Sequence, residues 1–157
     1  GNPRAHYNLG LAYHRRGGIE EAKSEYLLAI KLGHYWEAHD SLGKIYYDQG
    51  RIAEAMTELK TAIKLNPDYA IAHYNLGRIY AKVGLTEMAV KEYRIVIRLK
   101  PDYVAAHNNL GMAYANQGRI DEAIREFKIA IELDPDSEIA RTNLAVAYSE
   151  LGYKKEP

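Results

Sequence analysis

The chain has 157 residues, enough for one ordinary domain or for a short array of repeats. Its 21 basic and 21 acidic side chains balance, which argues against binding to nucleic acid or to an anionic membrane through an excess of positive charge. It contains no cysteine, so disulfide bonds and thiol chemistry are excluded. No apolar run approaches the roughly 20 residues that span a bilayer. We therefore expect no membrane insertion, and a cytoplasmic location.

Nine helices are predicted, because apolar residues recur at helical spacing along the whole chain. In chain order they cover residues 4–16, 19–32, 36–49, 52–65, 69–83, 86–99, 103–117, 120–133 and 137–151. The connections between them have only a few residues, which forces neighbouring helices into antiparallel hairpins.

The hairpin of residues 106–135 shows the local signals that set these boundaries. Gly118 is expected to end the first helix in a left-handed conformation, which costs glycine little. Asp121 and Glu122 place negative charge at the positive end of the second helix. Pro135 cannot continue that helix, and Asp136 is expected to cap the next one.

A nine-residue sequence motif recurs along the chain at a near-constant period. AHYNLGLAY (5–13) is followed by related segments at 38–46, 72–80 and 106–114, whose glycines are spaced 33, 34 and 34 residues apart. A fifth, partial copy covers 140–148. Such a period predicts a repeat array. We expect one array over 1–157, with repeats at about 3–35, 36–69, 70–103 and 104–137 and a partial fifth repeat at 138–157.

The repeated glycines Gly10, Gly43, Gly77 and Gly111 lie inside predicted helices, where each costs about 1 kcal/mol against alanine. Small residues lie opposite them in the second helices, at Ala22, Ala55, Ala89 and Ala123. We therefore expect each pair of helices to pack too closely there for a side chain. One junction differs, since Gly33-His34 replaces the usual X-Pro and the chain is one residue shorter.

These motifs resemble the tetratricopeptide repeat. The fourth unit supplies Leu110, Gly111, Tyr114, Ala123, Phe127, Ala130 and Pro135, and the other three units match in register. The resemblance covers essentially the whole chain. It implies an all-α fold, a right-handed superhelical solenoid of antiparallel helix pairs. It also implies that the first helices line a concave face and that the protein is a scaffold for protein–protein interaction.

By that resemblance, the concave face carries a column of amides just before each Leu-Gly pair. Its members are Asn8, Ser41, Asn75, Asn109 and Asn143. A carboxamide can both donate to and accept from one peptide unit, so the column could hold an extended chain by its backbone. It resembles an asparagine ladder found in this family, although Asn is also a common family residue at this place.

Other candidate peptide contacts surround this column. They are Tyr7, Tyr74, Lys44, Arg78, Asn108 and Met112, with Tyr47 as a further aromatic candidate. The family's carboxylate clamp, which grips a C-terminal carboxylate, is not satisfied here. Lys44 and Arg78 are the only suitable cations at its positions, and Asp40 would repel the ligand.

The remaining repeated residues are interpreted as structural. The histidine column consists of His6, His39, His73 and His107, and the tyrosine column of Tyr13, Tyr46, Tyr80, Tyr114 and Tyr148. Zinc needs ligand nitrogens within a few ångströms of one another, and histidines on successive stacked helices are expected to lie too far apart. We expect the tyrosines in the core and Trp36 in packing at the irregular junction. No phosphate loop, metal cluster or nucleophile–base pair is visible, so we expect no cofactor, no metal and no enzymatic activity.

The expected function is therefore capture of an extended peptide or a partner helix on the concave face. Two alternatives remain open. The array could self-assemble end to end into a homo-oligomer, since the last predicted helix keeps Leu144, Val146 and Leu151. It could also be the regulatory arm of a larger protein, and the start Gly1-Asn2-Pro3 without methionine is expected of an excised piece.

Overall fold

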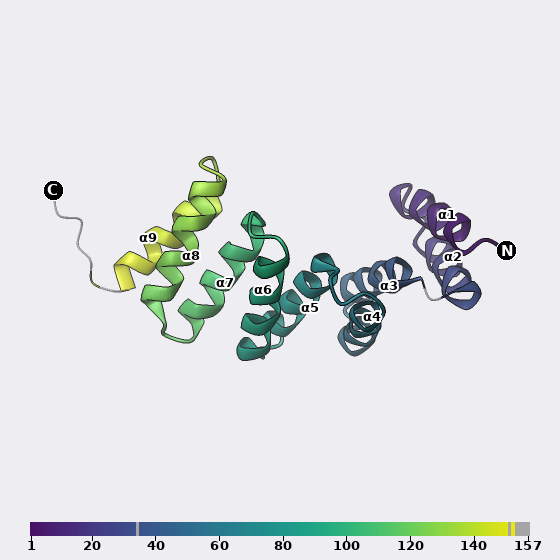
Figure 1. Cartoon of the computed structure of the whole chain (residues 1–157), viewed down its shortest axis with the longest axis horizontal. Helices are drawn as coiled ribbons and strands as arrows, with labels where there is room; N and C mark the ends of the chain where they lie inside the picture. The colour runs from purple at the N-terminus through teal and green to yellow at the C-terminus, as the bar shows by residue number, and fades with distance from the viewer. Residues whose placement is uncertain (34, 151, 153–157) are drawn as a thin grey trace. The chain divides into compact units, whose positions relative to one another are not determined.

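The computed structural model describes residues 1–33, 35–150 and 152, and within these residues it contains helices and turns but no strand. The helices are α1 (Pro3–Arg15), α2 (Ile19–Leu32), α3 (Trp36–Asp48), α4 (Ile52–Leu65), α5 (Ala70–Lys82), α6 (Thr86–Leu99), α7 (Val104–Asn116), α8 (Ile120–Leu133) and α9 (Glu138–Glu150) (Figure 1). The all-α prediction is confirmed. Within the described residues no helix boundary differs from its prediction by more than one residue.

The turn inside each hairpin is built on a glycine with positive φ, as predicted. At Gly118, φ is 73°. The Gly118 N–H donates to the Ala115 carbonyl over 2.8 Å, and the Arg119 N–H donates to the Tyr114 carbonyl over 3.0 Å. These two bonds satisfy carbonyls that the end of α7 would otherwise leave without partners. The left-handed residue thus reverses the chain into α8.

The predicted aspartate cap is wrong. α9 begins at Glu138, and the side chain that accepts from its first turn is Ser137, whose Oγ receives the Ala140 N–H over 3.5 Å. Asp136 lies one residue too early. Ser137 separates the turn at Pro135 and Asp136 from the helix, as Tyr103 separates the preceding turn from α7.

The hairpins are close-packed at the repeated glycines. A Cβ added to Gly111 would lie 2.6 Å from Cε1 of Phe127, and one added to Gly43 would lie 2.8 Å from Cγ of Leu59. The Ala55 carbonyl oxygen would also be only 3.3 Å from the Gly43 Cβ. The predicted close approach is therefore present at these glycines. The large side chain one turn beyond the alanine meets the glycine most closely.

The chain divides into two compact units, residues 1–79 (unit 1) and 80–157 (unit 2). In unit 1, α1 packs on α2 and α3 on α4, and α2 meets α3 through a core that includes Tyr26, Leu42 and Ile45. In unit 2, α7 packs against α6 and α8, and α8 against α9. Tyr93 and Phe127 are among its buried side chains.

The tyrosine column is buried only in part. Tyr80 and Tyr114 are in the core, with 2% and 6% of their surface exposed. Tyr46 and Tyr148 are half-buried, and Tyr13 is 36% exposed, so the core prediction is wrong for Tyr13. Tyr46 packs against the core cluster that α2 and α3 share.

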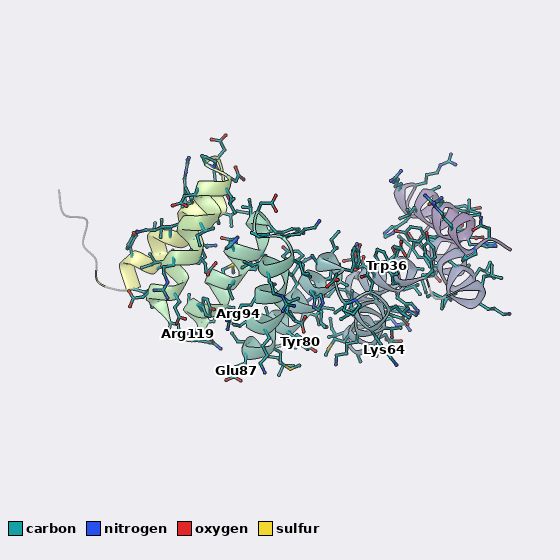
Figure 2. All side chains as sticks on the ribbon, viewed as in Figure 1. Trp36, Lys64, Tyr80, Glu87, Arg94 and Arg119 are labelled. Atoms are coloured by element: carbon teal, nitrogen blue, oxygen red, sulfur yellow. The ribbon has the colours of Figure 1, made fainter. Side chains whose placement is uncertain are left out.

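The irregular junction before α3 behaves largely as expected. α2 ends at Leu32, and Gly33 follows in an extended conformation, while His34 lies outside the described residues. Trp36, labelled in Figure 2, opens α3. Its ring centroid lies 4.3 Å from that of Tyr69. Trp36 is therefore a packing residue, as predicted. Of the helices described, none combines the length and the apolar character needed to cross a membrane.

Candidate functional site

Asn75, on α5 in the predicted amide column, is turned toward the preceding repeat. Its Nδ2 donates a hydrogen bond to Oδ1 of Asp40 on α3, over 2.9 Å. One N–H of the amide is therefore committed to the protein. The second N–H and the amide oxygen make no hydrogen bond with any described residue, so Asn75 keeps one donor and one acceptor.

Asp40 is a hub of this site, with only 1% of its surface exposed. Besides Asn75, it receives the Lys44 Nζ at 2.7 Å and the Tyr69 hydroxyl, which donates over 3.4 Å. A carboxylate can be buried only with such partners. Asp40 was expected to repel an acidic ligand, but Lys44 compensates its charge.

Tyr69 keeps its hydroxyl proton in this setting. Burial raises the pKa of Tyr69 well above its ordinary value, and the negative charge of Asp40 raises it further. The hydroxyl therefore serves as a donor to the carboxylate at any physiological pH.

A pocket of about 230 Å³ lies beside the Asn75–Asp40 bond. It is lined by His14 of α1, by Lys44, Tyr47 and Asp48 of α3, and by Asn75, Arg78 and Ile79 of α5. Two predicted cations, one predicted amide and one predicted tyrosine thus come together in unit 1. His14 was not predicted, and its Nδ1 lies 3.5 Å from the Tyr26 hydroxyl.

Arg78 is exposed, and its guanidinium lies over two tyrosine rings. Its Cζ is 5.4 Å from the centroid of Tyr47 and 5.9 Å from that of Tyr74. Cation–π attraction of this kind restricts where the guanidinium can lie. No carboxylate among the described residues forms an ion pair with Arg78.

The first two members of the amide column, Asn8 and Ser41, differ from Asn75. Ser41 is only 6% exposed. Burial raises the pKa of both Tyr7 and Tyr26, and interaction with the Ser41 side chain opposes that effect in each. At Tyr7 the charges of Glu37 and Asp40 reinforce the rise. Asn8 is exposed. The amide column is therefore not uniform, because its second member faces the protein interior.

Unit 2 repeats the amide bond with other neighbours. Asn143 Nδ2 on α9 donates to Asn108 Oδ1 on α7 over 2.9 Å, and Asn108 Nδ2 lies 3.8 Å from Met112 Sδ. Met112 and Val146 are 45% and 53% exposed. Asn109 is half-buried. The predicted residues Asn108, Met112 and Asn143 thus lie together on these two helices.

The histidine column ties first helices to second helices. Nδ1 of His6, His39 and His107 lies 2.6–2.7 Å from Oε2 of Glu25, Glu58 and Glu126, always 19 residues later. His107 Nε2 also donates to the Pro101 carbonyl over 2.8 Å. Within the described part of the chain, no group of three or more metal-ligating side chains is assembled. These contacts give the column a structural role.

The sequence reasoning missed Tyr69 as a site residue. A usable signal was the repeat period, which places Tyr35, Tyr69 and Tyr103 at one position before successive first helices. The Asp40–Lys44 pair also has the i, i+4 spacing of a helical ion pair. Neither signal says that the carboxylate is buried.

Two comparisons with known proteins bear on the family. Models of the tetratricopeptide (TPR) repeat match residues 3–32, 43–84, 86–118 and 113–152. Comparison with curated proteins gave no significant match.

Several solved structures share the fold. A crystal structure of MamA is 27% identical, with 91% of this chain and 84% of that chain covered and a TM-score of 0.84. YrrB, described as a TPR protein with an unusual peptide-binding site, is 24% identical, with coverage of 89% and 73% and a TM-score of 0.76. The first TPR domain of Spaghetti (RPAP3), bound to the HSP90 peptide SRMEEVD, is 20% identical, with coverage of 74% and 93% and a TM-score of 0.73.

Proposed function

Because this chain belongs to the tetratricopeptide-repeat family, we propose that it is a protein-interaction scaffold that holds an extended peptide on the face formed by its first helices. TPR repeats are typically non-enzymatic scaffolds. The structural relatives include a TPR domain in complex with a peptide, which agrees with the proposal.

The observation that carries the proposal is the orientation of the asparagine amides. Asn75 and Asn143 each donate one bond, over 2.9 Å, to a first helix of the preceding repeat. That bond restricts the rotation of the amide. The remaining N–H and oxygen can pair with the carbonyl and N–H of a peptide backbone, and an amide held in place loses less entropy on binding.

The residues assigned to peptide binding are those of the amide column and their neighbours, taken unit by unit. Unit 1 supplies Asn8, Ser41, Asn75, Tyr7, Tyr74, Lys44 and Arg78, and unit 2 supplies Asn109, Asn143, Asn108 and Met112. Backbone contacts through the amides give little sequence preference. The side chains around them supply the selectivity.

An immobilised library of random-sequence peptides tests the proposal, with Kd then measured for the peptides that bind. Asn75→Ala combined with Asn109→Ala should weaken binding at least tenfold, since each lost hydrogen bond contributes about 1 kcal/mol. Thr57→Ala with Thr61→Ala on α4, whose hydroxyls bond only within that helix, is the matched control. Unchanged affinity in a double asparagine variant that is still folded by circular dichroism contradicts the proposal.

A second candidate function is self-association through α9, where Ile139 and Val146 are 67% and 53% exposed. Leu151, part of that prediction, lies outside the described residues. Sedimentation equilibrium should then show a mass that rises with concentration and falls in Val146→Glu. A concentration-independent monomer removes this candidate.

A further inference from the structure

The pocket of unit 1 offers more hydrogen-bond donors than acceptors. Lys44 Nζ is 2.7 Å from Asp40, which leaves two of its three N–H groups, and Asn75 keeps one N–H. Arg78 adds five N–H groups, none of which bonds to a described residue. The side chains that only accept are the Asn75 amide oxygen and the Asp48 carboxylate, while His14 and Tyr47, which also line the pocket, can each donate or accept. This surplus favours a ligand that only accepts hydrogen bonds.

Arg78 is already positioned for such a ligand. Its guanidinium lies over the rings of Tyr47 and Tyr74, which leaves the planar edge with its parallel N–H groups for pairing with a carboxylate. The tyrosines also limit the side-chain entropy that binding would remove. Lys44, by contrast, already forms an ion pair with Asp40.

The negative charge of Asp48 would repel a carboxylate bound in this pocket, but the exposure of Asp48 weakens that repulsion. Asp48 is the last residue of α3 and is exposed, so water screens its charge. It forms no ion pair with any described residue, Arg78 included. Its effect on a bound carboxylate is therefore a modest repulsion.

We propose that this pocket binds the carboxylate of an acidic side chain, Asp or Glu, in an extended peptide whose backbone is held by Asn75. The inference rests on the proposed function and adds the chemistry of one peptide position. The pocket volume of about 230 Å³ is several times the roughly 30 Å³ share of one water molecule. A single side chain can therefore enter.

The test uses three short peptides in NMR titrations at low salt. Ac-Ala-Ser-Glu-Ser-Ala-NH₂ carries one internal carboxylate, its Gln counterpart carries none, and Ac-Ala-Ser-Gln-Ser-Ala with a free C-terminus carries only a terminal carboxylate. The Glu peptide should bind about tenfold more tightly than the amidated Gln peptide, equivalent to about 1.4 kcal/mol. It should also shift the Arg78 Nε–H signal. Tighter binding of the free-terminus peptide than of the Glu peptide assigns the pocket to a chain end and overturns the proposal.

Arg78→Gln should abolish the preference for Glu over Gln while leaving the weaker Gln binding intact. Arg98 is an exposed arginine on α6, the second helix of its repeat. The control variant Arg98→Gln should keep the preference for Glu. Asp48→Asn should strengthen Glu binding about twofold, because a repulsive charge is removed.

The outcomes separate this inference from the function on which it rests. Equal binding of the Glu and Gln peptides that still depends on Asn75 overturns the acidic-residue assignment and keeps the peptide scaffold. A preference that survives Arg78→Gln also overturns the assignment. If none of the peptides binds, and the random library also yields no ligand, both proposals fail.

Discussion

In unit 1 Asn75 on α5 donates a hydrogen bond to Asp40 on α3, and in unit 2 Asn143 on α9 donates one to Asn108 on α7. Both bonds are 2.9 Å long. The surroundings of the two bonds differ completely. In unit 1 the acceptor is a buried carboxylate with Lys44 and Tyr69 as further partners. In unit 2 it is a half-buried amide next to Met112. The repeat geometry therefore fixes the amide bond, and the neighbouring positions fix the chemistry that a ligand would meet.

The largest expected effect comes from removing the acceptor in each unit. Asp40→Ala leaves Lys44, Tyr69 and Asn75 without their shared partner, so the free energy of unfolding should fall by about 3 kcal/mol. Asn108→Ala removes a half-buried neutral amide and should cost about 1 kcal/mol. Urea unfolding of both variants measures the difference. Equal losses would show that the buried carboxylate is no more important to its unit than the amide.

The glycines give the second comparison. Gly111 faces the rigid ring of Phe127, whereas Gly43 faces the flexible side chain of Leu59. Leucine at Gly111 should destabilise the chain by about 3 kcal/mol, and leucine at Gly43 by about 1 kcal/mol, within the usual cost of overpacking. Gly77→Leu is also expected to cost about 1–3 kcal/mol. Thermal melts report these losses, and unchanged melting temperatures would count against close packing.

Replacing the donor asparagines, Asn75 and Asn143, should change the free energy of unfolding by amounts that differ less than those for the two acceptors. Asn75→Ala leaves Asp40 Oδ1 short of a partner inside the protein and should cost about 2 kcal/mol. Asn143→Ala should cost about 1 kcal/mol or less, because water can reach half-buried Asn108. Chemical denaturation separates these values. A larger loss for Asn143→Ala would reverse the proposed ranking of the two sites.

The smallest effect is confined to alkaline pH. Burial first, and then the charge of Asp40, raise the pKa of Tyr69 in the folded chain above its ordinary value of about 10. The unfolded chain then loses this proton first. The stabilisation is complete below pH 10 and declines as pH rises above it. Tyr69→Phe should reduce the loss of stability between neutral and alkaline pH. Identical pH profiles for Tyr69→Phe and the parent chain would contradict this.

Much of the fold followed from the repeat period and from a few local signals. Gly118 and its equivalents set the turns, and the second helices α2, α4, α6 and α8 have the predicted bounds. These features depend on residues close in sequence. The misplaced Asp136 cap and the exposed Tyr13 show the limit, since each depends on how a neighbouring segment is placed.

The candidate site was predicted less completely. The sequence placed Asn75, Lys44 and Arg78 on one face, because the period assigns them equivalent positions. It did not show that Asp40 is buried, that Tyr69 donates to it from 29 residues away, or that Ser41 is buried. Side-chain partners of this kind depend on rotamers and on the offset between neighbouring hairpins.

The sequence by itself determined the helices, their turns and the columns of equivalent residues, because helical periodicity and glycine conformation act over a few residues. Tertiary structure alone decided which amide is bonded to which neighbour, which carboxylate is compensated and which guanidinium has no carboxylate partner among the described residues. The physical reason is that burial and ion pairing depend on distances between separate helices. A one-dimensional repeat fixes the order of those helices but not the contacts of each side chain.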